Sequence, residues 1–323
     1  MPGVRIVLRV LVAVLLPMLL APTSALAEDE LAMLQRIAHG SRQLSYSGTF
    51  IYRSGGKVDT SRIAHAVIDG VEVERIEALD GSPREVLRVG SEVKCYFPDE
   101  KLLIVENRSR QRGFPGLLPV GLASLPEHYA IRNGGEGRVA GVKSRIVLLE
   151  PRDDLRYGHE LWVDAASGLL LKANLIGARG ETLESFAFIQ VNIGGALEQG
   201  ALKPSYDSER VRVHQVRTIE VKPEDMGWTF RTLVRGFRKV AAMKRQGPGD
   251  NSESLHVVFS DGLATISVFV EAGGAVGEPE AVSSAGPISV YRRQVGEHRL
   301  VVMGEVPALA VRRLGDGVER RRK

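Results

Sequence analysis

The sequence predicts a mainly β (α+β) protein: one large antiparallel sheet that curls toward a barrel, followed by a small α+β domain with about four antiparallel strands. Three observations carry this prediction. After one amphipathic helix, apolar and polar residues alternate in short runs over about 150 residues, the pattern of half-buried strands. Gly-rich turns separate the runs, including the Asp-Gly pairs at residues 69–70 and 80–81. Near Lys203 the composition changes, and 323 residues leave room for two domains.

The N-terminus has the order of a secretory signal peptide. Arg5 and Arg9 form a positive start, an apolar run follows, and Ala-Leu-Ala at residues 25–27 is a small-x-small cleavage site. The apolar run over residues 10–20 is short of the about 20 residues that a membrane-spanning helix needs. We therefore expect residues 1–27 to be removed and the mature chain to be soluble in the periplasm, rather than held by an N-terminal anchor.

The mature chain begins with a helix and continues with strands. Residues 28–44 read as a helix because Leu31, Leu34 and Ile37 fall on or near one face. Alternation then predicts antiparallel strands at residues 46–53, 62–68, 71–78, 85–89, 93–97, 101–106 and 145–150, and three more within residues 158–191. So many strands cannot lie flat, and the sheet is therefore expected to curl.

Both faces of the strands within residues 158–191 carry apolar side chains. Leu161 alternates with Trp162, and Phe188 alternates with Ile189. One face can pack on the N-terminal helix; the other can line a concave, lipid-holding cleft or be buried as plain core, and the spacing leaves both open. The candidates for lining such a cleft are Phe50, Tyr52, Phe114, Leu117, Leu118, Trp162, Phe186 and Phe188.

Residues 113–126, GFPGLLPVGLASLP, interrupt the strand pattern. The segment is apolar, but its Gly and Pro residues exclude a long helix and a ladder strand. It is expected to be a loop that covers one end of the core, or a gate over the lipid cleft. In the second case, Arg108, Arg110 and Arg112 would lie at the level of the lipid headgroups.

A polar stretch follows the sheet and separates it from the second domain. Residues 206–226 contain Pro223 and show little sustained pattern, which is typical of a linker. The expected division is a signal peptide at 1–27, a sheet domain at 28–205, a linker at 206–226, an α+β domain at 227–319 and a basic tail at 320–323.

The second domain is expected to contain two hairpins and a helix. Strands at residues 255–259 and 263–271 flank one turn, strands at 288–294 and 300–306 flank the other, and Pro307 opens a short helix. Residues 229–242 suit either a helix or a strand; a turn before Gly236 and a strand after it fit better.

The sequence contains little that points to catalysis. The seven His residues lack a metal-ligand spacing. Residues 135–140 match a dinucleotide-binding glycine pattern, but they precede an expected strand instead of joining a strand to a helix. The single Cys95 reads as a buried strand residue, and Asp153-Asp154 as a solvated turn cap. We expect no enzyme activity, no cofactor and no metal.

The charge of the mature chain is nearly balanced. Without Arg5 and Arg9, 41 basic residues face 39 acidic ones, a net charge of about +2. This balance gives no reason to expect nucleic acid as a partner. Local basic clusters, such as Arg292-Arg293, remain suited to acidic lipid headgroups or to an acidic peptide.

Four stretches together resemble the periplasmic sigma-E regulatory proteins of the RseB/MucB (AlgU-type) family, in order along the mature chain. They are LDGSPREVLRVGSEVKCYFPDEK, YGHELWVDAASGLLLKANLIGARGETLESFAF, SDGLATISVFVE and VVMGEVPALAVRRLGDGV. The resemblance implies an N-terminal half-open β-barrel with covering helices, similar to LolA and LolB, and a smaller C-terminal domain.

The resemblance also implies a function. Such proteins bind the periplasmic segment of a transmembrane anti-sigma factor of the RseA/MucA type, protect it from regulated proteolysis and are released by lipid or lipopolysaccharide. A periplasmic lipid or lipoprotein carrier is the alternative, and a homo-oligomer is left open. The residues expected to grip the partner are Trp228, Tyr291, Arg292 and Arg293.

Overall fold

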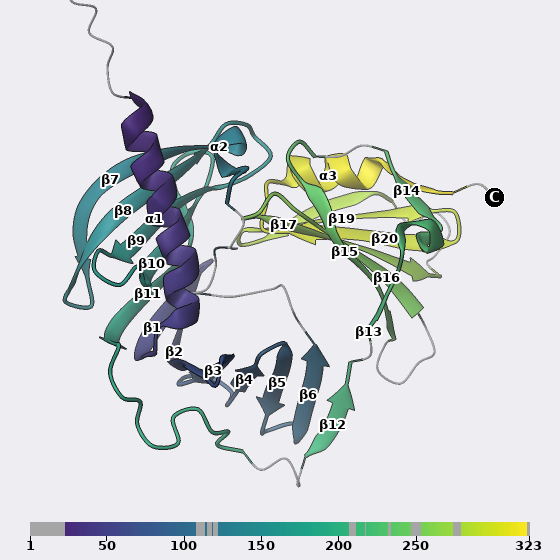
Figure 1. Cartoon of the computed structure of the whole chain (residues 1–323). Coiled ribbons are helices and arrows are strands. Elements are labelled where there is room, and N and C mark those ends of the chain that lie inside the picture. Colours follow the sequence, from purple (N-terminus) through teal and green to yellow (C-terminus); the bar gives the residue numbers. More distant parts are fainter. Residues whose placement is uncertain are drawn as a thin grey trace, which may run out of the picture.

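The structure of the chain, a computed structural model, contains two large β-sheets and a few helices (Figure 1). The described residues are 23–107, 114, 118, 122–206, 211–216, 218–231, 234–246, 253–273 and 279–321. Most of the expected signal peptide lies outside them, as do Arg108, Arg110, Arg112 and Leu117.

The N-terminal part is a twelve-stranded sheet in the order β12-β6-β5-β4-β3-β2-β1-β11-β10-β9-β8-β7. Its strands are β1 (Tyr46–Ser54), β2 (Lys57–Ile68), β3 (Val71–Ala78), β4 (Glu85–Val89), β5 (Glu92–Phe97), β6 (Leu102–Asn107), β7 (Tyr129–Val139), β8 (Val142–Pro151), β9 (Gly158–Asp164), β10 (Leu170–Ile176), β11 (Thr182–Ile193) and β12 (Arg212–Gln215). Neighbouring strands are antiparallel, except that β12 runs parallel to β6. The sheet curves but does not close, because β7 and β12 end it (Figure 1).

The two Asp-Gly pairs behave differently. Asp69 and Gly70 both have positive φ, 51° and 77°, and join β2 to β3 in the tight turn that the sequence predicts. The second pair lies in a longer connection between β3 and β4, where the carboxylate of Asp80 accepts the backbone N–H of Thr60 at 2.9 Å. Pro83 follows in this connection and has no N–H for a ladder bond.

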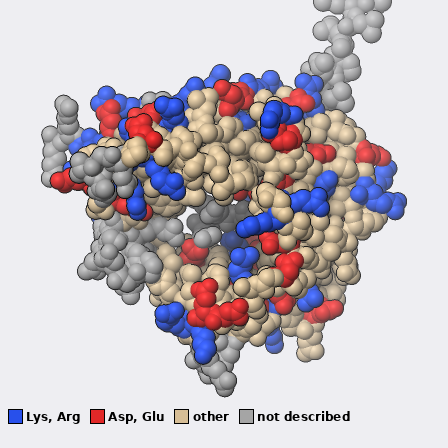
Figure 2. Space-filling model, turned by 180° about the vertical axis from the view of Figure 1, so that it is seen from behind, with Lys and Arg blue, Asp and Glu red and all other residues tan. Residues whose placement is uncertain are grey.

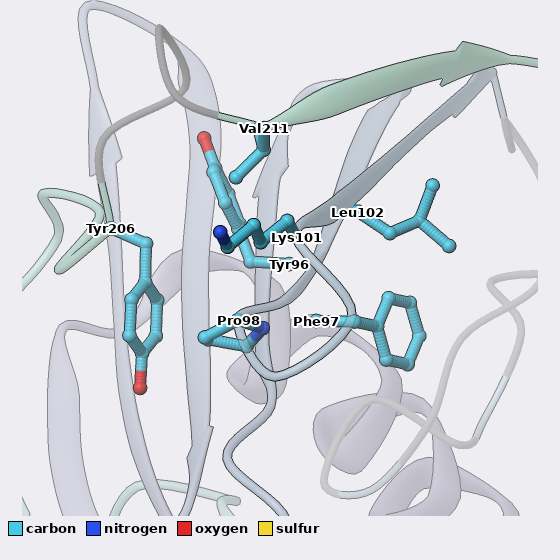
Figure 3. A pocket seen from close by; sticks show the side chains of 7 residues that line it. All are labelled: Tyr96, Phe97, Pro98, Lys101, Leu102, Tyr206 and Val211. Carbon is cyan, nitrogen blue, oxygen red and sulfur yellow. The ribbon is translucent and has the colours of Figure 1, made fainter.

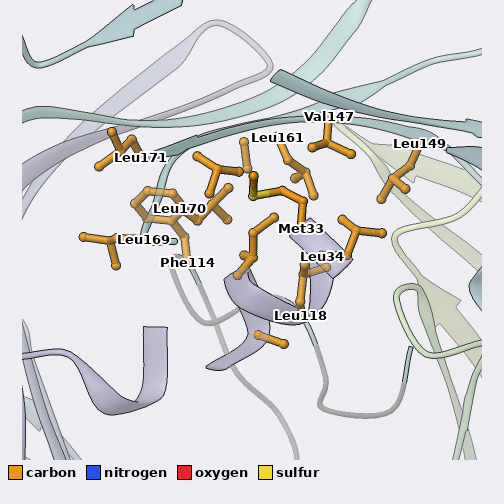
Figure 4. Packing of buried hydrophobic residues seen from close by; sticks show 14 of the residues in the cluster. Met33, Leu34, Phe114, Leu118, Val147, Leu149, Leu161, Leu169, Leu170 and Leu171 are labelled. Carbon is orange, nitrogen blue, oxygen red and sulfur yellow. The ribbon is translucent and has the colours of Figure 1, made fainter. Parts of the chain in front are cut away.

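Helix α1 (Thr23–Gln43) fills the concave side of this sheet (Figures 1 and 4). Met33, Leu34, Ile37 and Ala38 are fully or almost fully buried, at 0–2% exposure. They meet sheet and loop residues that are also buried: Phe114, Leu118, Val147, Leu149, Leu161, Val163, Leu169, Leu170 and Leu171. Since each large apolar side chain contributes about 1.5–3 kcal/mol on full burial, α1 is held by its amphipathic face.

Strand β7 is the main element that the sequence did not predict. Its register shifts between Asn133 and Gly135, and Gly135 has φ of 90°. Gly137 faces the ring of Trp162, where any Cβ would overlap the indole. The residues matching the dinucleotide pattern therefore lie within a strand and its turn. Three glycines removed the alternation that would have revealed it.

The C-terminal part is built on a seven-stranded sheet, where the sequence predicts about four strands. The order is β13-β15-β16-β17-β20-β19-β18. The strands are β13 (Thr218–Glu220), β15 (Arg238–Gln246), β16 (Glu253–Ser260), β17 (Thr265–Ala272), β18 (Ala281–Ala285), β19 (Ile288–Val295) and β20 (His298–Gly304). The strand after Gly236 is confirmed as β15. The edge strands β13 and β18 were missed because all their residues are exposed and carry no alternating pattern.

Short elements complete the fold. Helix α3 (Ala308–Asp316) follows Pro307 as predicted and packs on β19 and β20. Strands β14 (Trp228–Phe230) and β21 (Val318–Arg320) pair with each other, and α2 (Leu125–His128) and a 3-10 turn, η2 (Pro223–Met226), lie in connections. Residues 206–226 are not structureless, since β12 and β13 both lie within them.

Candidate functional site

Five of the aromatic residues expected to line a cleft lie together. Phe50 and Tyr52 on β1 are opposite Phe188 and Phe186 on β11, and the Tyr52 and Phe186 rings are 4.6 Å apart. Phe114 comes from the connection after β6 and stacks on Phe186, with ring centroids 5.5 Å apart and an angle of 9°. These contacts define the aromatic cluster of Phe50, Tyr52, Phe114, Phe186 and Phe188.

The aromatic cluster is covered by the protein's own side chains in this structure. Phe50, Phe114 and Phe188 are buried at 5%, 3% and 2% exposure, and Leu118 beside them at 1%. Leu118 belongs to the same connection as Phe114, so this connection supplies side chains to the core (Figure 4). The aromatic cluster thus lies on the concave face of the sheet, and Phe114 and Leu118 occupy the space next to it.

Trp162 lies away from the aromatic cluster. Its neighbour Leu161 is buried at 1% exposure in the core with α1, so Trp162 points to the other face of the sheet. There its ring packs on Gly137 and carries the Lys172 ammonium at 4.6 Å from the ring centroid. Trp162 therefore serves a cation–π contact on the far face. Cys95 is half-buried on β5, less enclosed than the sequence predicts.

A carboxylate with a raised pKa lies beside the aromatic cluster. The Tyr52 hydroxyl donates a hydrogen bond to Glu184 Oε2 at 2.9 Å. The pKa of Glu184 is raised from 4.5 to about 7: burial is the largest cause, the negative charge of Glu305 adds to it, and the Tyr52 hydrogen bond opposes both. Partial burial also raises the pKa of Glu305. Glu184 belongs to the N-terminal sheet and Glu305 follows β20, so two carboxylates from different halves repel each other.

A buried ion pair joins the halves at a second point. The Arg156 side chain, in the turn between β8 and β9, has no exposed surface, and its Nη1 donates to Asp261 Oδ2 at 2.5 Å. Its Nε donates to Asp153 Oδ1 at 2.9 Å, and its Nη2 donates to the carbonyl of Arg235. The hydroxyl of Tyr129 also donates to Asp261 Oδ2, at 3.3 Å. Every charged group in this cluster thus has a partner.

At the same place, each half contributes an apolar side chain to the core of the other half. Leu155, next to Arg156, is 3% exposed and belongs to the C-terminal core, while Leu263 packs on the N-terminal core. The carboxylate of Asp153 caps the turn, as the sequence predicts, but it also binds Arg156. The two halves are thereby fixed together around Arg156.

Of the four residues expected to grip a partner, only Arg292 is exposed. Trp228 is 7% exposed and packs edge-on against His298. Tyr291 is buried, and its hydroxyl donates to Asp316 Oδ1 at 2.6 Å. The Nη2 of Arg293 donates to the carbonyl of Val318 at 2.6 Å, which holds the turn after α3.

The sequence did not single out Arg156, Asp261 or Glu184. Arg156 and Asp261 both lie in polar turns, where nothing in the local pattern marks a buried ion pair. Glu184 could have been found, because it shares the strand face of Phe186 and Phe188 at a period of two. A carboxylate in that row is out of place on an apolar face.

A surface depression lies between β5 and β6, away from the aromatic cluster (Figure 3). It has a volume of about 230 Å³ and is lined by Tyr96, Phe97, Pro98, Lys101, Leu102, Tyr206 and Val211. It is below the about 300–1,000 Å³ of sites for drug-sized ligands. Among the described residues, no group of three or more His, Cys, Asp or Glu could hold a metal ion, and no helix is long and apolar enough to cross a membrane.

The surface charge is mixed. On the face in Figure 2, Lys and Arg side chains are interspersed with Asp and Glu, and both kinds lie around a hollow near the centre of the view. A surface of this kind does not favour a polyanion. The protein is thus built from two mainly antiparallel sheets joined by a buried ion pair, with α1 and the aromatic cluster on the concave face of the larger sheet.

The chain belongs to the MucB/RseB family. The family model of the MucB/RseB N-terminal domain matches residues 29–206, and that of the C-terminal domain matches residues 222–319. The sigma factor AlgU regulatory protein MucB of Pseudomonas aeruginosa is 33% identical over 306 residues, covering 91% of this chain and 92% of MucB. The sigma-E factor regulatory protein RseB of Escherichia coli K12 is 24% identical over 290 residues, 89% of this chain and 90% of RseB.

Solved structures agree with these relatives. The complex of Pseudomonas aeruginosa MucA and MucB contains a chain that matches with a TM-score of 0.73 and 30% identity, over 91% of this chain and 100% of that one. MucB in complex with the periplasmic part of MucA matches with a TM-score of 0.71 and 30% identity, over 92% of this chain and 100% of that one.

Proposed function

We propose that this chain is a periplasmic negative regulator of a sigma-E-type envelope-stress response. In this role it binds the periplasmic segment of a transmembrane anti-sigma factor of the MucA/RseA type and shields that segment from regulated proteolysis. The observation that carries the proposal is the likeness of both halves, together, to MucB in its complex with MucA. A binding role needs no catalytic group, and the protein is proposed not to be an enzyme.

The organisation follows from this role. Residues 1–27 would direct export to the periplasm, and residues 28–205 would form a half-open barrel whose concave face holds α1 and the aromatic cluster. Residues 227–319 would form the second domain. The segment at residues 206–226 contributes one strand to each sheet, which supports a coupled pair of domains rather than two independent ones.

Lipid is the proposed signal for release. Phe114 and Leu118 lie on the concave face where an acyl chain would contact Phe186 and Phe188. Replacing one set of apolar contacts by another costs little free energy, which supports exchange of a lipid for these side chains. A lipid carrier is the second candidate. Carriage needs only the N-terminal sheet, so the fixed C-terminal half argues against it.

Calorimetric titration tests the main proposal. Residues 28–323 are titrated with the periplasmic segment of Pseudomonas aeruginosa MucA, with and without lipopolysaccharide. Saturable binding that lipopolysaccharide weakens supports regulation, whereas saturable lipid uptake without peptide binding supports the carrier.

The lipid surface has its own pair of variants. Phe186→Asp introduces a charge into the aromatic cluster, while Ile189→Asp, at a residue 55% exposed on the other face of β11, is the matched control. Binding of a fluorescent fatty acid should weaken at least tenfold in the first variant only. Equal binding of the fatty acid by both variants would show that the aromatic cluster is not the lipid site.

A further inference from the structure

Strand β18 is an unprotected sheet edge. It is the last strand of the C-terminal sheet, and all five of its residues, Ala-Val-Ser-Ser-Ala, are exposed. It contains no charge and no proline, and its pairing with β19 runs without a bulge. A strand edge of this kind presents free N–H and C=O groups to another chain unless the protein blocks it.

The other three edges of the two large sheets, β7, β12 and β13, carry features that discourage such pairing. Strand β7 has a register shift between Asn133 and Gly135 and the charged residues Arg132, Glu136 and Arg138. Strand β12 has four residues and includes Arg212, and β13 has only three residues and ends at Glu220. Short, bulged or charged edges are the usual protection against pairing, and β18 has neither charge nor bulge.

The backbone groups that β18 offers can be assigned from its hairpin. The register pairs Ala285 with Ile288 across the two-residue turn at Gly286-Pro287. In a two-residue hairpin this closing pair is hydrogen-bonded, and outward-facing groups then alternate along the strand. The N–H and C=O groups of Val282 and Ser284 therefore point away from β19 and are available to a further strand.

The side chains around β18 indicate what kind of peptide strand could pair with this edge. On one face, exposed Arg292 lies opposite Ala281, and its Nη1 donates to Ser283 Oγ at 3.4 Å, so that the guanidinium lies over the edge. On the other face, Val282 is 45% exposed. Leu309 of α3, the helix packed beside β18, is 40% exposed. One face of the edge thus carries the Arg292 cation. The other carries the apolar Val282 and Leu309, and Glu280 just before the strand is hydrogen-bonded to Tyr291 on this face.

We propose that β18 binds an extended segment of the partner's periplasmic part as an eighth strand, with an acidic side chain toward Arg292 and an apolar one toward Val282. This inference rests on the proposed function and adds the surface and the chemistry of recognition. Main-chain hydrogen bonds would supply affinity, and the alternating side chains would supply specificity.

A second copy of this chain suits the edge less well. Two β18 strands paired antiparallel about Ser283 would bring both Arg292 guanidinium groups over the same point on one face. Like charges placed opposite each other across a strand pair are destabilising. An acidic peptide residue would instead neutralise the single guanidinium.

The edge also ends at the boundary between the two halves. A Cβ placed on Gly286, in the turn after β18, would lie 2.9 Å from the Oγ of Ser54 at the end of β1. A peptide strand that runs along β18 and past this turn therefore reaches the N-terminal sheet. One extended segment could contact both halves.

The test compares lysine substitutions at exposed apolar residues on three edge strands. Val282→Lys blocks β18; Ile219→Lys on β13 and Val213→Lys on β12 are matched controls, since these residues are 58% and 55% exposed. The full mature chain is titrated with the periplasmic segment of MucA. We expect Val282→Lys to weaken binding at least tenfold and each control to change it less than twofold.

Charge and backbone readouts complete the test. Arg292→Glu should weaken binding about fivefold, an effect that is screened at high salt. Hydrogen exchange should show the amides of Val282 and Ser284 protected only in the complex. Wild-type binding that Val282→Lys leaves unchanged, without protection of these amides, would overturn the β18 site alone. Failure of the wild type to bind would overturn the proposed function and this site with it.

Discussion

The two halves of the protein meet at two charged contacts of opposite character. At one, Arg156 is buried with Asp261, and each polar group of the cluster has a partner. At the other, the negative charges of Glu184 and Glu305 repel each other, and the Tyr52 hydroxyl donates a hydrogen bond to Glu184. The first contact pairs opposite charges that complement each other. The second changes with pH, because burial and the opposing charge of Glu305 raise the pKa of Glu184.

The largest effect is expected at the first contact. Arg156→Met leaves Asp261 buried without its cation, and breaking a buried pair in this way costs about 3–5 kcal/mol of unfolding free energy. Urea denaturation measures the loss. Arg132→Met is the control, because its pair with Glu150 is 64% and 51% exposed and should contribute about 0–1 kcal/mol. Equal losses for the two variants would contradict the role of the buried pair.

A glycine at the same contact gives the next largest effect. Gly236 has φ of 84° and faces the His128 ring, so Gly236→Ala combines backbone strain with a steric overlap. We expect it to cost about 2–3 kcal/mol, since the left-handed conformation alone costs about 1–2 kcal/mol for other residues. Gly55→Ala, at φ of 54° with open space around the Cβ, isolates the strain. Thermal unfolding should separate the two variants clearly.

The acidic contact predicts a smaller, pH-dependent effect. The pKa of Glu184 is raised from 4.5 to about 7, so folding takes up a proton between these values. Stability from this group is therefore fully present below about pH 4.5 and is lost as the pH rises through about 7. Glu184→Gln should stabilise the protein by about 1–2 kcal/mol at pH 8 and hardly change it at pH 5. Equal effects at both pH values would show that Glu184 stays charged.

Glu305→Gln refines this comparison and has the smallest expected effect. It removes the second largest cause of the raised pKa while leaving the burial of Glu184 in place. The pH at which stability falls should therefore move down, and stability at pH 8 should rise by about 0.5–1 kcal/mol. Titration of the Glu184 carboxyl by NMR measures the shift directly. An unchanged pKa of Glu184 in this variant would show that the charge of Glu305 does not act on it.

Local patterns predicted the local structure well. The Asp69-Gly70 turn and helix α3 after Pro307 follow from residue chemistry alone. Strand β7 could not be predicted, because its glycines serve a bulge and the packing of Trp162, neither of which is visible in sequence. The pairing of Arg156 with Asp261 joins residues 105 positions apart and depends on how the two sheets meet.

The candidate site divides in the same way. Strand alternation places Phe186 and Phe188 on one face, and Phe50 was named beside them as a cleft candidate; the structure brings the three together. Tyr291 and Arg293 were chosen by residue type alone, and in this structure both donate hydrogen bonds to residues at and after the end of α3. Composition marks residues able to bind a partner, but only packing shows which of them are already engaged.

The segment between the two sheets sets a mechanical limit on their separation. Strand β12 is held by β6, the N–H of Val216 still donates to the carbonyl of Val105 at 2.9 Å, and β13 begins at Thr218 on the other sheet. Two Cα–Cα steps span at most about 7.6 Å. A larger separation of the two halves must break the hydrogen bonds between β12 and β6 or those between β13 and β15. A force that pulls the sheets apart therefore acts first on an edge strand of one of them.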